Sequence, residues 1–325
     1  MASLSDWKIS PARQPDAADY DFDLDRALAS AVSLRTIVPP DAFTADTLGT
    51  ERGGTGIVIR DNVVLTIGYL ITEAEEIWIG LDDGRAVAGH PLAYDQATGF
   101  GLVQALGSLD LPSLPLGDSA AAAQGNRVVI AAAGGREHAL AARIVAKQEF
   151  AGYWEYVLDE AIFIAPAHPF WGGTGLIGPG GDLIGIGSLQ VEHGTSGDEG
   201  DHLNMVVPID LLKPILDDMM ETGSAKRPPK PWLGLFASEL DGQVFVVGVY
   251  TDAPADAAGL KPGDLIESVA GEPVAGLADF FRKAWAFGPA GGEVPIIASR
   301  EGETLKTRIV TSERELFLKK PQMHS

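Results

Sequence analysis

The stretch that decides the fold of this chain is Phe170-Trp-Gly-Gly-Thr-Gly-Leu-Ile-Gly-Pro-Gly-Gly-Asp-Leu-Ile-Gly-Ile186. Its first half is rich in glycine and predicts a tight turn, while Leu183-Ile-Gly-Ile186 predicts a short β-strand after a Gly-Gly-Asp turn. Gly172, in the middle of the first turn, has no side chain and therefore no group that attacks a carbonyl.

Similar short β-branched runs, bounded by turn residues, lie on both sides of this stretch. They favour a β-barrel or sandwich, as do the 39 glycines and 21 prolines of the chain. The apolar residues of Val207–Met220 recur at helical spacing and predict a helix that closes this domain. The expected strands are 56–59, 63–66, 76–79, 101–103, 127–130, 156–158, 162–164 and 183–186.

Composition excludes several classes of function. The 325 residues carry a formal net charge of −21, which argues against nucleic acid or anionic lipid as a partner. Cysteine is absent, so the chain has no disulfides, thiolate metal sites or cysteine nucleophiles, and we expect no cofactor. The first ten residues contain no apolar signal core, which predicts a cytoplasmic protein if Met1 is the native start and a periplasmic one if the chain has been trimmed.

The pattern divides the chain into five segments. A polar, proline-containing arm is followed by a β domain, a proline-rich linker that favours an extended spacer, a second domain and a short basic tail. Uncharged Ala161–Gly181 contains several prolines and glycines and does not fit a membrane span. The boundaries are 1–24, 25–222, 223–231, 232–314 and 315–325.

Several motifs of the first large segment resemble those of HtrA/Deg-type trypsin-like serine proteases. Gly53-Gly-Thr-Gly-Ile-Val-Ile59 is similar to the strand that opens the barrel, Val64-Leu-Thr66 to the strand before the catalytic histidine, and Leu116-Gly-Asp-Ser119 to a turn of that family. The opening stretch resembles the nucleophile segment. The resemblance implies a mainly β fold, a trypsin-like double β-barrel, and by analogy a trimer formed through aromatic residues of the arm.

The same register implies that all three catalytic positions have changed. Tyr69 stands where the family has its histidine, Gly99 where it has its aspartate, and Gly172 where it has its serine. A phenol with a pKa of about 10 is a poor general base near neutrality. The resemblance also implies an oxyanion hole formed by the backbone N–H groups of Gly172 and Phe170, and we expect the bulky Phe170-Trp171 pair to fill the cleft. We therefore expect a protein without proteolytic activity.

Two relocated activities remain as alternatives. Thr174 and His168 lie close in sequence and offer a hydroxyl and an imidazole for a hydrolase. The acidic loop between His193 and His202 offers oxygen and nitrogen ligands to a divalent cation, although a solvated loop is the simpler interpretation.

The second domain resembles a PDZ domain. Val249-Tyr-Thr-Asp-Ala-Pro-Ala-Asp-Ala-Ala-Gly-Leu-Lys-Pro-Gly-Asp-Leu-Ile266 is similar to a long PDZ motif, and Trp232-Leu-Gly-Leu-Phe236 to the loop that binds a terminal carboxylate. The resemblance implies a groove that receives a peptide as an added strand. The expected peptide-binding residues are Trp232, Leu233, Gly234, Leu235 and Phe236, with Phe280, Phe281 and Ala284 on the opposite helix. A groove that is vestigial, or filled by the chain itself, for example by its own tail, is the alternative.

Together these features predict an adaptor, a chaperone-like holder or a structural subunit that binds other proteins or C-terminal peptides through its PDZ groove. A regulatory subunit that forms mixed oligomers with an active homologue is a further alternative.

Overall fold

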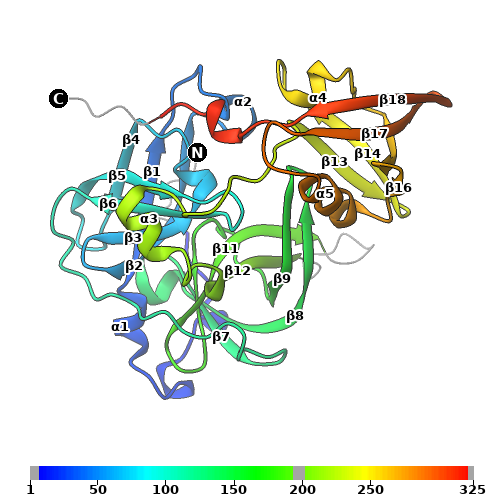
Figure 1. Cartoon of the computed structure of the whole chain (residues 1–325). Helices are drawn as coiled ribbons and strands as arrows, with labels where there is room; N and C mark the ends of the chain where they lie inside the picture. Colours follow the sequence, from blue (N-terminus) through cyan, green and yellow to red (C-terminus); the bar gives the residue numbers. More distant parts are fainter. Residues whose placement is uncertain (1–6, 193–201, 321–325) are drawn as a thin grey trace. The chain divides into compact units, whose positions relative to one another are not determined.

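The computed structural model describes residues 7–192 and 202–320. These residues form two compact units (Figure 1). The first contains residues 7–148, 160–192, 202–226 and 319–320, and the second contains residues 149–159 and 227–318. The second unit therefore includes a short piece of the expected protease domain.

The first unit contains two closed six-stranded barrels, as the resemblance implied. In the first barrel the strands follow the order β1-β2-β3-β6-β5-β4. Every residue of β3 is buried, and the strand leads directly into the short 3-10 helix η4 (Gly68–Leu70). The strands are β1 (Ala31–Ile37), β2 (Glu51–Arg60), β3 (Val63–Ile67), β4 (Glu76–Gly80), β5 (Ala86–Tyr94) and β6 (Phe100–Ala105).

The second barrel has the strand order β10-β11-β12-β9-β8-β7. Its core is made mainly of β-branched and leucine side chains such as Val128, Ile130 and Ile162, which pack well in pleated strands. Its strands are β7 (Arg127–Ala131), β8 (Leu140–Gly152), β9 (Tyr156–Ala165), β10 (Gly175–Ile177), β11 (Leu183–Glu192) and β12 (His202–Pro208).

Short helical segments complete the first unit. The described part of the arm packs against the second barrel, where Ile9 is buried and Trp7 lies against the same apolar cluster. After the barrels, Pro208 ends β12, and the helix begins only at Leu216, later than expected. These segments are η2 (Pro11–Arg13), η3 (Ala17–Asp19), α1 (Leu24–Leu28), α2 (Ala45–Leu48), η5 (Gly135–His138), η6 (Ile209–Leu211) and α3 (Leu216–Thr222).

The second unit contains a sheet with the strand order β13-β14-β15-β17-β18, and β16 pairs with β15. Helix α5 buries Phe280 and Phe281 against this sheet. The elements are β13 (Leu235–Leu240), β14 (Gln243–Val249), α4 (Pro254–Ala257), β15 (Leu265–Val269), β16 (Glu272–Pro273), α5 (Leu277–Ala286), β17 (Glu293–Arg300), β18 (Glu303–Val310) and η7 (Arg314–Leu316).

The expected strands all lie within strands of the structure, although 156–158 and 162–164 are parts of the single strand β9. Among the barrel strands, the sequence pattern did not indicate β5, β8, β10 or β12. In β5 most residues are only half-buried, so the alternation of apolar and polar residues that marks a strand is weak.

Candidate functional site

The structure brings together the three positions that the resemblance assigns to the catalytic residues, namely Tyr69, Gly99 and Gly172. Gly68, the residue before Tyr69, donates its backbone N–H to the carbonyl of Gly99 over 2.7 Å. A Cβ atom built on Gly172 would lie 2.8 Å from the Tyr69 hydroxyl oxygen. Three segments that are far apart in sequence therefore meet where the register of the resemblance requires it.

Tyr69 is held as a hydrogen-bond donor. Its hydroxyl donates to the carbonyl oxygen of Ser188 over 2.8 Å. Burial raises the pKa of Tyr69 well above its ordinary value, and a hydrogen bond from the side chain of Trp171 offsets this only in part. A phenol that keeps its proton in this way does not accept one from a nucleophile near neutral pH.

The turn before Gly172 is closed by a buried histidine. The Phe170 N–H donates to Nδ1 of His168 over 3.1 Å, and Nε2 of His168 lies 2.9 Å from the carbonyl of His138. Nδ1 also lies 3.0 Å from the carbonyl oxygen of Phe170, so both ring nitrogens contact backbone groups. His168 is fully buried, and burial lowers its pKa, which favours a neutral ring. The Phe170 N–H, one of the two expected oxyanion donors, is thus directed toward the buried His168 ring.

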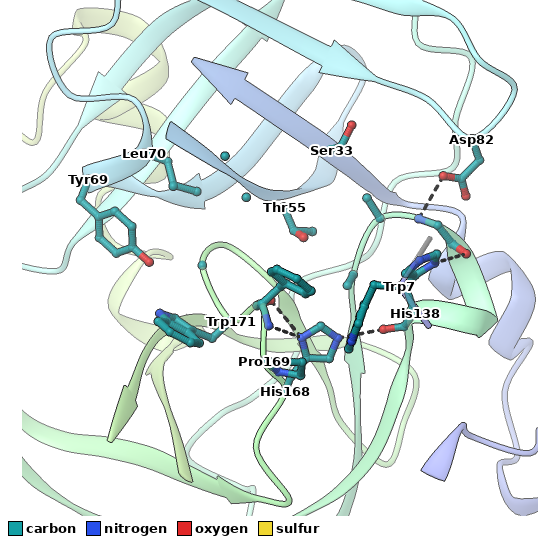
Figure 2. Close-up of a pocket in the computed structure, with 17 residues that line it drawn as sticks. Trp7, Ser33, Thr55, Tyr69, Leu70, Asp82, His138, His168, Pro169 and Trp171 are labelled. Atoms are coloured by element: carbon teal, nitrogen blue, oxygen red, sulfur yellow. Dashed lines mark hydrogen bonds between the residues drawn. The ribbon is translucent and has the colours of Figure 1, made fainter. Parts of the chain in front are cut away.

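A cavity of about 580 Å³ remains beside these positions (Figure 2). Phe170 and Trp171 line it, and Phe170 is 44% exposed, so these rings do not fill the cleft as expected. Figure 2 shows Trp7 beside His168, and the Trp7 ring contacts that of Phe170 with a centroid separation of 4.8 Å. The arm thus contributes a wall of the cavity.

The relocated hydrolase receives no support from the geometry. Thr174 is buried, and its hydroxyl donates to the carbonyl of Trp171 over 2.9 Å. Both ring nitrogens of His168 already bind backbone groups. The pair is therefore not arranged as a nucleophile and its base. His193 and the whole loop up to residue 201 lie outside the described residues, and the described part of the chain contains no cluster of three metal-ligating side chains.

The second candidate site is the carboxylate-binding loop of the second unit. Gly234 has a φ of +76°, and a Cβ there would lie 2.6 Å from the Cβ of Ala253, so the turn requires glycine. The backbone N–H groups of Leu233, Gly234 and Leu235, which the resemblance assigned to a terminal carboxylate, all donate to one carboxylate. That carboxylate is the side chain of Glu155.

Glu155 makes three hydrogen bonds in this loop. Leu233 donates to Oε2 over 2.9 Å, while Gly234 and Leu235 donate to Oε1 over 2.7 Å and 3.2 Å. Burial raises the pKa of Glu155 to about 7, although the three N–H donors and Arg314 act in the opposite direction. Its φ of +62° lies in the left-handed region, which a glutamate adopts only when its surroundings fix it.

Most of the other expected peptide-binding residues are buried, and Phe236 is half-buried. Phe280, Phe281 and Ala284 are fully buried in a cluster that also contains Val157, two residues after Glu155. Trp232 is buried, and Phe236 contacts the ring of Tyr153 with a centroid separation of 5.7 Å. The side chains expected to form the helix wall are thus buried in the core of the second unit, and they do not form an exposed wall of a groove.

Sequence reasoning missed Glu155 and Tyr153. They stand in the turn Gly152-Tyr-Trp-Glu155 between β8 and β9, which has the composition of an ordinary hairpin turn. The positive φ of Glu155 is not visible in the sequence, and its three partners are about 80 residues away along the chain. No local pattern reports such a contact.

Comparison with known proteins supports the two domains. Residues 54–186 match the trypsin-like peptidase domain, and residues 231–311 match the PDZ domain. A probable periplasmic serine endoprotease DegP-like of Hahella chejuensis is 29% identical over 241 residues, which is 69% of this chain and 49% of that protein. A protein of the same description from Pseudomonas fulva is 27% identical over 277 residues, 79% of this chain and 56% of that protein. The chain spans about half the length of the curated relatives it matches.

Solved structures agree on the fold. The HtrA-type protease AlgW with a decapeptide superimposes with a TM-score of 0.53 at 20% identity, covering 92% of this chain and 98% of that chain. The chain is thus mainly β, with a trypsin-like peptidase domain followed by a PDZ domain, as predicted. Among the described residues no helix is long and apolar enough to cross a bilayer.

Proposed function

We propose that this chain is a non-proteolytic protein of the HtrA type that binds other proteins through its PDZ domain, as an adaptor, chaperone-like holder or structural subunit. One observation carries the proposal: the Tyr69 hydroxyl faces the bare Cα of Gly172 and donates to Ser188. A nucleophile and a base are the two groups that this class of protease needs there, and neither residue supplies one.

A cleavage assay with casein and fluorogenic peptides tests the first half, with a DegP-type relative as positive control. We expect no turnover above buffer. Turnover that disappears in Thr174→Ala, or on addition of a chelator, would restore the relocated activities.

Binding tests the second half. The native, untagged protein should co-purify with partners, and an array of C-terminal peptides should identify apolar last residues, as expected of a PDZ groove. If a well-folded protein gives neither, the adaptor function is wrong. A co-purifying homologue that retains its histidine and serine would favour the mixed-oligomer alternative.

A further inference from the structure

We propose that Glu155 is an internal ligand of the PDZ carboxylate-binding loop, so that a protein C-terminus must displace the hairpin tip before it binds. The inference rests on the proposed peptide-binding function and adds an occupant and a competition to it. The hairpin tip, defined here as residues 152–155, joins β8 to β9.

Two sets of contacts carry the inference. The Glu155 carboxylate accepts from three successive backbone N–H groups, at Leu233, Gly234 and Leu235. Two residues earlier, the Tyr153 carbonyl accepts from the N–H of Ala237 in β13 over 2.9 Å. A peptide that binds as an added strand uses the same two features, namely a carboxylate in the loop and a main-chain bond to the adjacent edge strand.

The side chains around the tip favour occupation of the groove. Tyr153 lies against Phe236, and the Trp154 and Tyr156 rings stack with centroids 5.6 Å apart. Glu155 is only 5% exposed, so water does not compete for the hydrogen bonds between its carboxylate and the loop N–H groups while the tip is docked. A free carboxylate from another chain therefore has no donors left in this loop.

The contacts also indicate how the tip can leave. Tyr153, at the tip, is 55% exposed, so about half of its side chain has no protein cover to lose. Val157, by contrast, is anchored in the core of the second unit. The tip can therefore open while the base of the hairpin stays in place.

Hydrogen exchange and peptide binding test the proposal on the full-length chain. Glu155→Ala removes both acceptor oxygens, and Glu267→Ala, an exposed carboxylate on β15 of the same unit, is the matched control. At pH 7.5 we expect the amides of Leu233–Leu235 to exchange at least tenfold faster in Glu155→Ala and unchanged in Glu267→Ala.

The binding arm uses fluorescein-labelled decapeptides that end in Val, Leu or Phe, each with a free carboxylate or a terminal amide. We expect Kd for the free acids to fall at least tenfold in Glu155→Ala relative to the wild type and the control, while the amides remain weak. Equal Kd values in the three proteins, or unchanged exchange at the loop, overturn the proposal.

Two further results separate the inference from the proposed function. If exchange rises but no peptide binds any variant, the internal ligand stands and the peptide-binding function fails. If Glu155→Ala does not fold, the wild type provides the test: saturating free-acid peptide should accelerate exchange in residues 149–159. Exchange there that does not change when the peptide is bound overturns displacement.

Discussion

The substitution Gly172→Ser is the most direct test of how the site around Tyr69 and Gly172 is built. Gly172 is not in the left-handed region, so a serine fits its backbone. Its Cβ would nevertheless lie 2.8 Å from the Tyr69 hydroxyl oxygen, closer than such contacts normally are. Tyr69 must therefore move, and its hydrogen bond to Ser188 is lost or lengthened.

The steric contact and the lost hydrogen bond give an approximate change in the free energy of unfolding. Overpacking of this kind costs about 1–3 kcal/mol, and a lost neutral hydrogen bond adds about 1 kcal/mol. Replacing glycine lowers the entropy of the unfolded chain, which returns about 0.4–1 kcal/mol. We expect a net destabilisation of about 2 kcal/mol, which lowers the Tm of a unit of this size by about 4–8 °C.

Tyr69→Phe provides the matched background, because it removes the hydroxyl that the new Cβ meets. Calorimetry of the wild type, both single variants and the double variant forms a cycle. We expect Gly172→Ser to be less destabilising when it is combined with Tyr69→Phe, with a coupling of at least about 1 kcal/mol. No coupling would refute the placement of Tyr69 against Gly172.

The same variant should not cleave casein. A serine at position 172 would face a protonated phenol, whereas a general base contributes about 10²–10⁴ in rate. Even with Tyr69→His and Gly99→Asp added, the Phe170 N–H remains bonded to His168, and loss of one oxyanion donor costs about 10²–10³. Measurable cleavage by Gly172→Ser alone would show that the register or the account of Tyr69 is wrong.

Three further predictions concern other parts of the chain. Burial raises the pKa of Glu155 to about 7 from 4.5, so the docked tip binds a proton more tightly than the released one. Docking is therefore strongest below pH 4.5 and weakens up to pH 7; free-acid peptides should bind the wild type roughly 25-fold more tightly at pH 8 than at pH 5.5. Glu155→Gln should remove this difference, and an equal pH dependence in that variant would contradict the assignment. Gly234→Ala should destabilise the second unit by about 1–3 kcal/mol, because Gly234 has a φ of +76° and a Cβ there would lie 2.6 Å from the Cβ of Ala253. The control Gly242→Ala has a similar φ and open space around it, so equal melting curves for the two variants would mean that the destabilisation comes from backbone strain and not from the contact with Ala253. Trp7→Ala should lower the stability of the first unit by about 3 kcal/mol, since Trp7 packs on the barrel cluster and on Phe170; a change below about 0.5 kcal/mol would mean that the arm does not dock in solution.

The sequence predicted the two domains well because their signals are local. The PDZ motif of Val249–Ile266 contains a turn, a helix start and a glycine stop in fixed order, and the structure has α4 and β15 there. The assignment of Tyr69, Gly99 and Gly172 to the catalytic positions stays a prediction, and it rests on a register that neighbouring residues such as Asp95 and Thr98 keep. Asp95 accepts from the N–H and hydroxyl of Thr98 in a buried turn.

What the sequence did not predict depends on contacts between distant segments. Phe170 was expected to fill the cleft on the basis of its size, but its N–H binds buried His168 and its ring lies against Trp7. The exact position of such a ring depends on a segment far earlier in the chain. Helical spacing likewise placed Val207 in a helix, whereas pairing with Ile186 places it in β12, because tertiary pairing overrides local periodicity.

The Glu155 contact shows why a motif alone does not define a binding site. The loop Leu233–Leu235 was expected to bind a terminal carboxylate from its pattern, and its donors do converge on a carboxylate. The pattern fixes the chemistry of the ligand, but three N–H groups do not distinguish a chain terminus from a side chain that presents the same two oxygens. The adjacent hydrogen bond from the Ala237 N–H to the Tyr153 carbonyl shows that the occupant is a strand-like segment of this chain. The proposed competition makes the affinity for an external peptide depend on the difference in binding free energy between the peptide carboxylate and the Glu155 carboxylate in one loop, so it changes with the hairpin tip as much as with the groove.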